Sequence, residues 1–299
     1  MIPFLLFILN FSQKQIADSH LIIDAATSRY ASEYILISTP FGIYTFDRNA
    51  RTWKSITTTH GLPDNQARVM GLDQGIMWVA TDKGLASADI RLNDWQTYAL
   101  PGPVTGLAFD DYYVWVTGRF GLKRFDKYAE TWEDITDAPA SDILFDKTYI
   151  WLATAQGIWR YNTEFEKLEP MYAAPKHEYY YIIETKSKLW FLAPHYFVSF
   201  HRLTESWSEY QAFAIEDYSS IGDSLFALSG GSVYLYDPAT DSWGPFVEIE
   251  GYGPLNGLSA NPKVSNIISL ATNGGLILYD WAEKTRKDYN LANGMYYDT

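Results

Sequence analysis

The sequence contains no cysteine. This absence excludes disulfides, thiolate metal sites, cysteine nucleophiles and a lipid anchor on cysteine, and it says nothing about the cellular compartment. No apolar run reaches the roughly 18 residues that a membrane-spanning helix needs. Basic residues are also scarce: 23 lysines and arginines stand against 36 aspartates and glutamates, which gives a formal net charge of -13. A surface of that sign does not favour nucleic acid or anionic lipid as a partner.

Sequence motifs for known chemistries are missing as well. The 5 histidines form no pair at the spacing of metal ligands on a helix or a strand. The signatures of zinc hydrolases, serine hydrolases, phosphate-binding loops and dinucleotide-binding enzymes are absent. We therefore expect no catalytic residues, no metal site and no cofactor.

Aromatic side chains, by contrast, are abundant. They make up 17% of the 299 residues, including 11 Trp and 23 Tyr, and apolar residues reach 47%. Such a composition can bury a large core, so disorder is excluded. Along the chain a motif recurs with a period of about 40 residues, which is typical of a propeller. It consists of glycine, an apolar residue, two variable residues, an apolar residue and usually aspartate. The seven copies are Gly42–Asp47, Gly84–Asp89, Gly121–Asp126, Gly157–Asn162, Tyr196–His201, Ser232–Asp237 and Gly275–Asp280.

Two further columns keep register with this motif. One column lies eleven positions before the last residue of each motif copy. It contains Leu36, Trp78, Trp115, Trp151, Trp190, Phe226 and Ser269. The other column lies six positions after the last residue of each motif copy. It contains Trp53, Trp95, Trp132, Leu168, Trp207, Trp243 and Arg286. Nine of the eleven tryptophans therefore belong to structural columns. We expect them to pack between sheets and not to stack on a ligand.

Runs of alternating apolar and polar residues between turn signals predict four strands in each repeat. In repeat two they are Ala67–Asp73, Ile76–Thr81, Gly84–Asp89 and Trp95–Leu100. In repeat five the first strand is expected at Glu178–Glu184 and includes Tyr179 and Tyr180. The prediction is an all-β, seven-bladed β-propeller of four-stranded antiparallel blades, occupying residues 18–299 as a single domain. No strand is visibly exchanged between the two ends of the chain.

The first residues are interpreted separately. Ile2–Leu9 is apolar apart from Pro3 and is followed by polar residues, so residues 1–17 are expected to be a signal peptide. The mature protein would then be periplasmic or secreted. In the alternative, this segment is a buried strand that helps to close the fold, and the protein is cytoplasmic.

The repeats resemble a known family. Gly61–Val69, followed by Met77–Leu85, is similar to the two-component regulator propeller repeat, and repeats three, four and seven carry the same pattern. Repeat five departs from it at Tyr196 and His201, and repeat six resembles a kelch repeat instead. The resemblance covers roughly residues 20–290. It implies an extracytoplasmic ligand-sensing module, often followed on the same chain by a membrane helix and a histidine kinase, neither of which this sequence contains.

Strand direction predicts where a ligand would bind. In an antiparallel blade, the turn between the second and third strands and the connection to the next blade lie at the same end, and loops on a rigid scaffold build binding sites. The pairs Arg119-Phe120 and His195-Tyr196 break the repeat there, and a cation beside an aromatic ring suits a planar or anionic group or a sugar face. The candidate ligand-binding residues are His60, Asp82, Lys83, Arg119, Phe120, His177, His195 and Tyr196.

Because a fold does not determine a function, alternatives stay open. The favoured hypothesis is a non-catalytic binding or sensing module for a small molecule, an oligosaccharide or a peptide. The second is a protein-interaction scaffold in cell-envelope or secretion machinery, which would expose an apolar patch to a protein partner. The third is a propeller lyase or hydrolase resembling streptogramin lyase. It would gather histidine and carboxylates around a metal, and His60, His177 and His195 share the proposed face.

Overall fold

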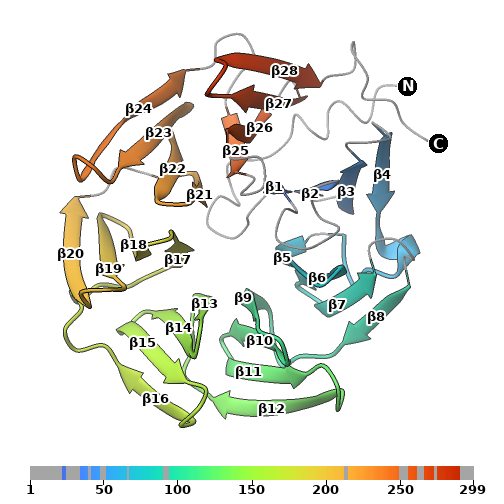
Figure 1. Cartoon of the computed structure of the whole chain (residues 1–299). Coiled ribbons are helices and arrows are strands. Elements are labelled where there is room, and N and C mark those ends of the chain that lie inside the picture. The colour runs from blue at the N-terminus through green and yellow to red at the C-terminus, as the bar shows by residue number, and fades with distance from the viewer. Residues whose placement is uncertain are drawn as a thin grey trace. The chain divides into compact units, whose positions relative to one another are not determined.

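The computed structural model describes residues 22–24, 34–39, 42–47, 52–65, 67–89, 94–211, 215–248, 255–260, 266–272 and 275–289. Its strands form seven four-stranded antiparallel sheets, and the strands of each sheet lie in chain order (Figure 1). The predicted all-β propeller of four-stranded antiparallel blades is confirmed at this level. The sheets are divided between two compact units, of which the first comprises Met1–Tyr98 with Ile215–Thr299 and the second comprises Ala99–Ala214.

The first unit contains four of the sheets and one short 3-10 helix, Thr58–His60. Its strands are β1 (Ile22–Asp24), β2 (Tyr34–Thr39), β3 (Gly42–Asp47), β4 (Thr52–Ile56), β5 (Ala67–Asp73), β6 (Ile76–Thr81), β7 (Gly84–Asp89), β8 (Trp95–Tyr98), β21 (Asp217–Ile221), β22 (Ser224–Ser229), β23 (Ser232–Asp237), β24 (Ser242–Glu248), β25 (Leu255–Ala260), β26 (Ile267–Thr272), β27 (Gly275–Asp280) and β28 (Thr285–Tyr289). Strand β1 contacts β25, so the first and last sheets lie side by side. Among the described strands, none is exchanged between these two sheets.

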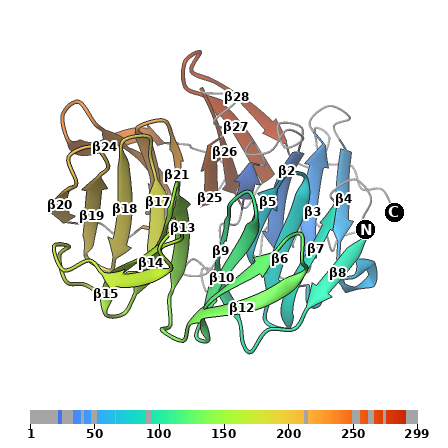
Figure 2. The same cartoon turned by 60° about the horizontal axis from the view of Figure 1, so that its bottom comes forward.

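The second unit contains the other three sheets. Its strands are β9 (Val104–Phe109), β10 (Tyr113–Gly118), β11 (Gly121–Asp126), β12 (Thr131–Thr136), β13 (Asp142–Asp146), β14 (Tyr149–Thr154), β15 (Gly157–Asn162), β16 (Lys167–Pro170), β17 (Tyr181–Glu184), β18 (Lys188–Ala193), β19 (Tyr196–His201) and β20 (Ser206–Gln211). Strand β13 contacts both β9 and β17, and the three lie beside one another in Figure 1 and Figure 2.

Hydrogen bonds show that these three strands run in the same direction. Thr105 near the start of β9 donates through its hydroxyl to the carbonyl of Ala140, just before β13, at 2.7 Å. The Asp142 carboxylate at the start of β13 accepts the backbone N–H of Ile182, near the start of β17, at 2.8 Å. Since the three starts meet, corresponding turns of the three sheets lie at the same end of the unit.

Two faces of the second unit follow from this direction. The turn face consists of the turns after the first and third strands of each sheet, namely residues 110–112, 127–130, 147–148, 163–166, 185–187 and 202–205. The loop face consists of the turns after the second strands and the connections between sheets, namely residues 119–120, 137–141, 155–156, 171–180 and 194–195.

The tryptophans of the second strands are buried, as expected. Trp78, Trp115, Trp151 and Trp190 are at most 4% exposed. The ring of Trp151 meets Phe200 of the next sheet at 5.1 Å between centroids. Trp115 likewise packs with Tyr161 of its neighbouring sheet. Burial of such large rings between sheets supplies much of the apolar area that stabilises the fold, so the aromatic excess has an architectural cause.

The first strand of the fifth sheet is shorter than expected. It begins at Tyr181, so the prediction that Tyr179 and Tyr180 belong to it is wrong. The backbone N–H of Tyr179 donates to the carbonyl of Thr154 at 3.1 Å, and its hydroxyl donates to the carbonyl of Pro175 at 2.6 Å. These bonds hold the buried Tyr179 in the connection between sheets. Residues 1–17, the expected signal peptide, lie outside the described residues. In the part of the chain that the structure describes, no helix is long and apolar enough to cross a membrane.

Candidate functional site

The eight candidate residues are divided between the two units. His60, Asp82 and Lys83 belong to the first unit, whereas Arg119, Phe120, His177, His195 and Tyr196 belong to the second.

The candidates of the first unit are engaged in local contacts. The guanidinium of Arg68 on β5 donates through Nη2 to Asp82 at 3.0 Å. Lys83 Nζ lies 3.0 Å from a carboxylate oxygen of Asp64, and both lysine and aspartate are partly exposed. His60 Nδ1 accepts the backbone N–H of Thr57 at 3.1 Å. The first two contacts join the β6–β7 turn to β5 and to the loop before it, whereas the His60 bond lies within that loop.

The candidates of the second unit include a cluster on the loop face of the sheet β17–β20. The ring of Tyr196, the first residue of β19, stacks on the imidazole of His177 with centroids 4.4 Å apart and planes 17° apart. His177 Nε2 lies 3.0 Å from Glu209 Oε2 on β20. Tyr179 presents its ring edge-on to His177 at 5.9 Å. The imidazole is thus fixed between one exposed aromatic ring, one buried aromatic ring and a carboxylate.

Strand register explains why Tyr196 and Glu209 meet there. Glu209 pairs with Val198, which stands two residues after Tyr196 on β19. Residues two apart on a strand point to the same face, so Tyr196, Val198 and Glu209 share one side of the sheet. The sequence reasoning missed Glu209. The signal that could have found it is its position two residues after Trp207, since that column already faces the neighbouring sheet.

The stack depends on the loss of the repeat's glycine in this sheet. At the corresponding position in the third sheet, Gly121 has φ +94°, and a Cβ there would collide with the carbonyl oxygen of Thr136. Tyr196 pairs with Gln211 in a regular antiparallel ladder instead and is not among the residues with positive φ. A side chain can therefore project from this column and cover His177, whereas five of the other six repeats have glycine at this position and the sixth repeat has Ser232.

The polar groups of the cluster differ in their exposure to solvent. The side chains of His177 and Glu209 are 22% and 40% exposed, so both remain open to solvent. Burial, together with the charge of Glu209, raises the pKa of Tyr179, whose phenol therefore stays protonated and donates to Pro175. Among the described residues, no group of three or more histidine, aspartate or glutamate side chains could hold a metal ion.

The remaining candidates lie on two other turns of the loop face, which belong to the sheets β9–β12 and β17–β20. Arg119 is exposed in the β10–β11 turn. Phe120 beside it is partly buried, and its ring occupies the space where a Cβ on Gly118 would stand. His195 is exposed in the β18–β19 turn, directly before Tyr196. Of the eight candidates, the structure therefore brings His177 and Tyr196 into ring contact.

Comparison with known proteins supports the fold. No protein-family model and no curated protein matches the sequence. Among solved structures, the chain is similar to the extracellular domain of BT4673 from B. thetaiotaomicron, which is assigned to a hybrid two-component system. That match has a TM-score of 0.67 and 17% identity, and it covers 87% of this chain and 38% of the other.

Two further solved structures show the range of proteins with this architecture. One is PorZ, a surface component of the type-IX secretion system of Porphyromonas gingivalis, with a TM-score of 0.68, 13% identity and coverage of 92% of this chain and 38% of that one. The other belongs to a mitotic checkpoint complex, with a TM-score of 0.65, 10% identity and coverage of 92% and 90%. The match thus spans 38% of the solved BT4673 extracellular domain and 38% of the solved PorZ chain. At these identities the likeness shows the propeller fold alone.

Proposed function

We propose that this chain is a non-catalytic, extracytoplasmic binding module of the two-component regulator propeller family, with its seven sheets closed into one seven-bladed propeller. The observation that carries the binding role is the Tyr196–His177 stack with Glu209 beside it. An extracellular domain and a bacterial surface component among the similar structures support a periplasmic or secreted location.

The chemistry of the cluster indicates the ligand class. An exposed tyrosine ring offers an apolar face, while the imidazole and the carboxylate at its edge offer hydrogen bonds. Tyr172 and Tyr180, in the same loop as His177, are also exposed. An oligosaccharide combines flat apolar faces with hydroxyl groups in this way, so it is the favoured ligand, ahead of a peptide or another small molecule.

A thermal-shift screen of the full chain tests this function. Oligosaccharides, peptides and divalent metals are compared on the wild type, Tyr196→Ala, His177→Ala and the control Gln156→Ala, which alters an exposed residue on the neighbouring turn. A ligand whose free concentration is about a hundred times its Kd stabilises the folded state by about 2.7 kcal/mol. We expect a saturable shift with an oligosaccharide, and at least tenfold weaker binding by Tyr196→Ala than by Gln156→Ala. A shift equal in all variants, or none at all, would contradict the proposal.

A protein-interaction scaffold is the second candidate. It is favoured by the likeness to a secretion-system component and by seven large apolar residues that are exposed in the described part of the chain. All seven belong to the second unit: Tyr112, Tyr128, Phe165, Tyr172, Tyr180, Tyr196 and Leu203.

A further inference from the structure

Four of the exposed apolar side chains lie on turns of the turn face, at the end of the sheets opposite the candidate ligand site. Tyr112 is 61% exposed, Tyr128 78%, Phe165 77% and Leu203 88%. The rings of Tyr112 and Tyr128 lie 6.2 Å apart, so they form one aromatic surface. The other two follow on the corresponding turns of the next two sheets. The Tyr112–Tyr128 pair joins two large exposed rings, and exposed apolar surface of this kind marks interaction sites in soluble proteins.

The repeat itself does not require apolar residues at these positions. In the sheets β9–β12 and β17–β20 the motif copies end at Asp126 and His201, and Tyr128 and Leu203 each lie two residues later. At the same position in the first unit, the turns β23–β24 and β27–β28 carry Ala239 and Ala282. Since alanine meets the demands of the turn, the architecture does not explain the large side chains of the second unit.

The turns that carry these side chains are held rigidly. In all three sheets the first residue of the turn donates its backbone N–H to a carbonyl of the turn after the first strand: Lys127 to Tyr112 at 3.0 Å, Thr163 to Thr148 at 2.9 Å and Arg202 to Ser187 at 3.0 Å.

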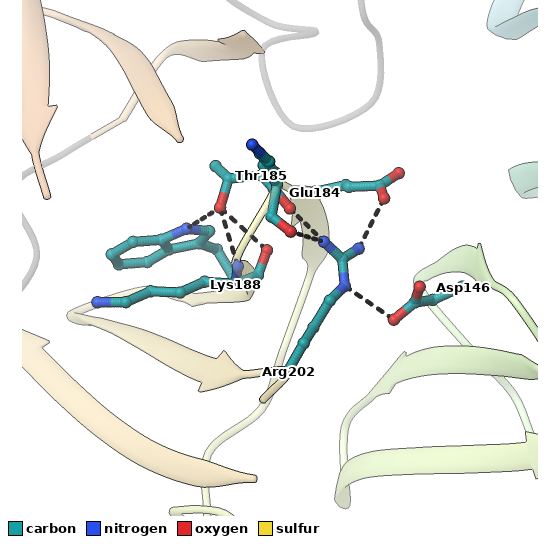
Figure 3. A network of polar contacts seen from close by, with 7 residues as sticks. Asp146, Glu184, Thr185, Lys188 and Arg202 are labelled. Atoms are coloured by element: carbon teal, nitrogen blue, oxygen red, sulfur yellow. Dashed lines mark hydrogen bonds and ion pairs between the residues drawn. The ribbon is translucent and has the colours of Figure 1, made fainter. Parts of the chain in front are cut away.

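Side chains add further bonds to these turns. Asp126 accepts the N–H groups of Tyr128 and Ala129, both at 2.8 Å. The guanidinium of Arg202 is bound between Asp146 and Glu184, so Leu203 projects from an anchored turn (Figure 3). Apolar side chains on preorganised turns lose little conformational entropy when a partner covers them.

The charges around the apolar residues indicate the partner's sign. The exposed charged residues of the six turns comprise five acidic residues, Asp111, Glu130, Glu164, Glu166 and Glu205, and two basic residues, Lys147 and Lys186. Glu164 and Glu166 flank Phe165 directly, and Glu205 shares its turn with Leu203. Complementary charge across an interface speeds encounter and selects the partner. A partner for this face should therefore be basic as well as apolar.

We propose that the turn face is a docking surface for a polypeptide segment that combines lysine or arginine with large apolar side chains. This surface is distinct from the Tyr196–His177 cluster, so a protein partner and a ligand would engage opposite ends of the same sheets.

The test uses a phage-displayed library of random twelve-residue peptides selected on the full chain, after which enriched peptides are synthesised and their binding is measured. The key variant is the triple substitution Tyr128→Ser, Phe165→Ser and Leu203→Ser, which leaves the charge of the protein unchanged. The matched control is Tyr172→Ser, which removes an equally exposed ring from the loop face. Circular dichroism and the melting temperature confirm that both variants fold.

We expect the enriched peptides to contain both basic and apolar residues. Their binding should weaken at least tenfold in the triple variant and stay unchanged in the control. Peptides that bind the triple variant as well as the wild type, that are acidic, or that are not enriched at all would overturn the proposal. Self-association in sedimentation velocity that only the triple variant abolishes would also overturn it, because the occupant would then be a second copy of the chain.

Discussion

Arg202 on the β19–β20 turn donates through Nε to Asp146 at the end of β13, at 2.9 Å, and so joins two neighbouring sheets (Figure 3). The same guanidinium donates through Nη2 to Glu184 at 2.6 Å and through Nη1 to the carbonyls of Thr185 and Lys186. Only 15% of the Arg202 side chain and 14% of the Asp146 side chain are exposed. The ion pair therefore lies in a largely buried interface between the two sheets.

Arg202→Met should destabilise the protein. It keeps much of the packing volume but leaves Asp146 and two carbonyls without their donor, which should lower the free energy of unfolding by about 2–4 kcal/mol. Urea titration followed by tryptophan fluorescence measures the change. In the control Arg119→Met, an exposed arginine is replaced and the change should stay within about 0.5 kcal/mol. Equal midpoints for the two variants would show that the Arg202 contacts contribute nothing.

The engagement of Asp146 has a consequence for the tryptophan of its sheet. In the third sheet, Asp110 accepts the indole N–H of Trp115 at 2.6 Å. Asp146 precedes Trp151 by the same five positions that separate Asp110 from Trp115. Its carboxylate, however, binds Arg202. The indole nitrogen of Trp151 is buried and has no hydrogen-bond partner among the described residues. Two repeats with the same residue types thus differ in hydrogen bonding because a neighbouring sheet supplies an arginine.

This difference predicts unequal effects of the same substitution. Trp115→Phe and Trp151→Phe remove similar apolar area, but only Trp115→Phe loses a hydrogen bond and leaves a carboxylate oxygen without its donor. We expect Trp115→Phe to cost about 1–2 kcal/mol more than Trp151→Phe. Urea titration of the two variants side by side measures the difference. If Trp151→Phe proved the more harmful, the assignment of the two indole environments would be wrong.

The repeat made most of the fold predictable. The motif ends at Asp126, Asn162 and Asp280 are turn residues that cap the turn after the third strand, and short polar residues with this role can be recognised from sequence. Strand ends are less predictable, because they depend on contacts with the next sheet. Tyr179 has strand-like neighbours in sequence, yet its bonds to Thr154 and Pro175 draw it out of β17.

The candidate site was predictable only in part. Tyr196 stood out because it replaces the repeat's glycine, and His177 because it lies in a long connection on the same face. Glu209 carries a weaker signal, its position two residues after Trp207, because exposed glutamates are common on outer strands and its approach to His177 depends on strand register. The rigid presentation of Tyr128 and Leu203 likewise depends on hydrogen bonds between turns, which the sequence does not reveal.

Two glycines of the repeat should respond differently to alanine. Gly121 and Gly157 both have positive φ, at +94° and +123°. A Cβ at Gly121 would collide with the carbonyl oxygen of Thr136, whereas a Cβ at Gly157 would meet nothing within 4 Å. Gly157→Ala should therefore cost only the backbone strain, about 1–2 kcal/mol. Gly121→Ala should cost at least about 1 kcal/mol more, since β11 and β12 must also shift. Thermal melts of both variants decide this, and equal losses would contradict it.

The last prediction concerns pH and the buried carboxyl of Asp217. It accepts the N–H of Tyr218 at 2.9 Å and the N–H of Leu258, in the neighbouring sheet, at 2.7 Å. Burial raises its pKa from 3.8 to about 7. The folded state therefore binds this proton more tightly than the unfolded state. The resulting stabilisation is complete below about pH 4 and is lost as the pH rises through 7, with a slope of up to about 1.4 kcal/mol per pH unit.

Asp217→Asn removes this titration, so its free energy of unfolding should fall less steeply than that of the wild type between pH 4 and 7. Urea titrations at several pH values measure the two slopes. The control is Asp237→Asn, because the N–H of Ala239 lowers the pKa of this exposed carboxyl and places its titration below that window. The control should follow the wild type. An Asp217→Asn curve parallel to both would show that the carboxyl keeps an ordinary pKa in the folded protein.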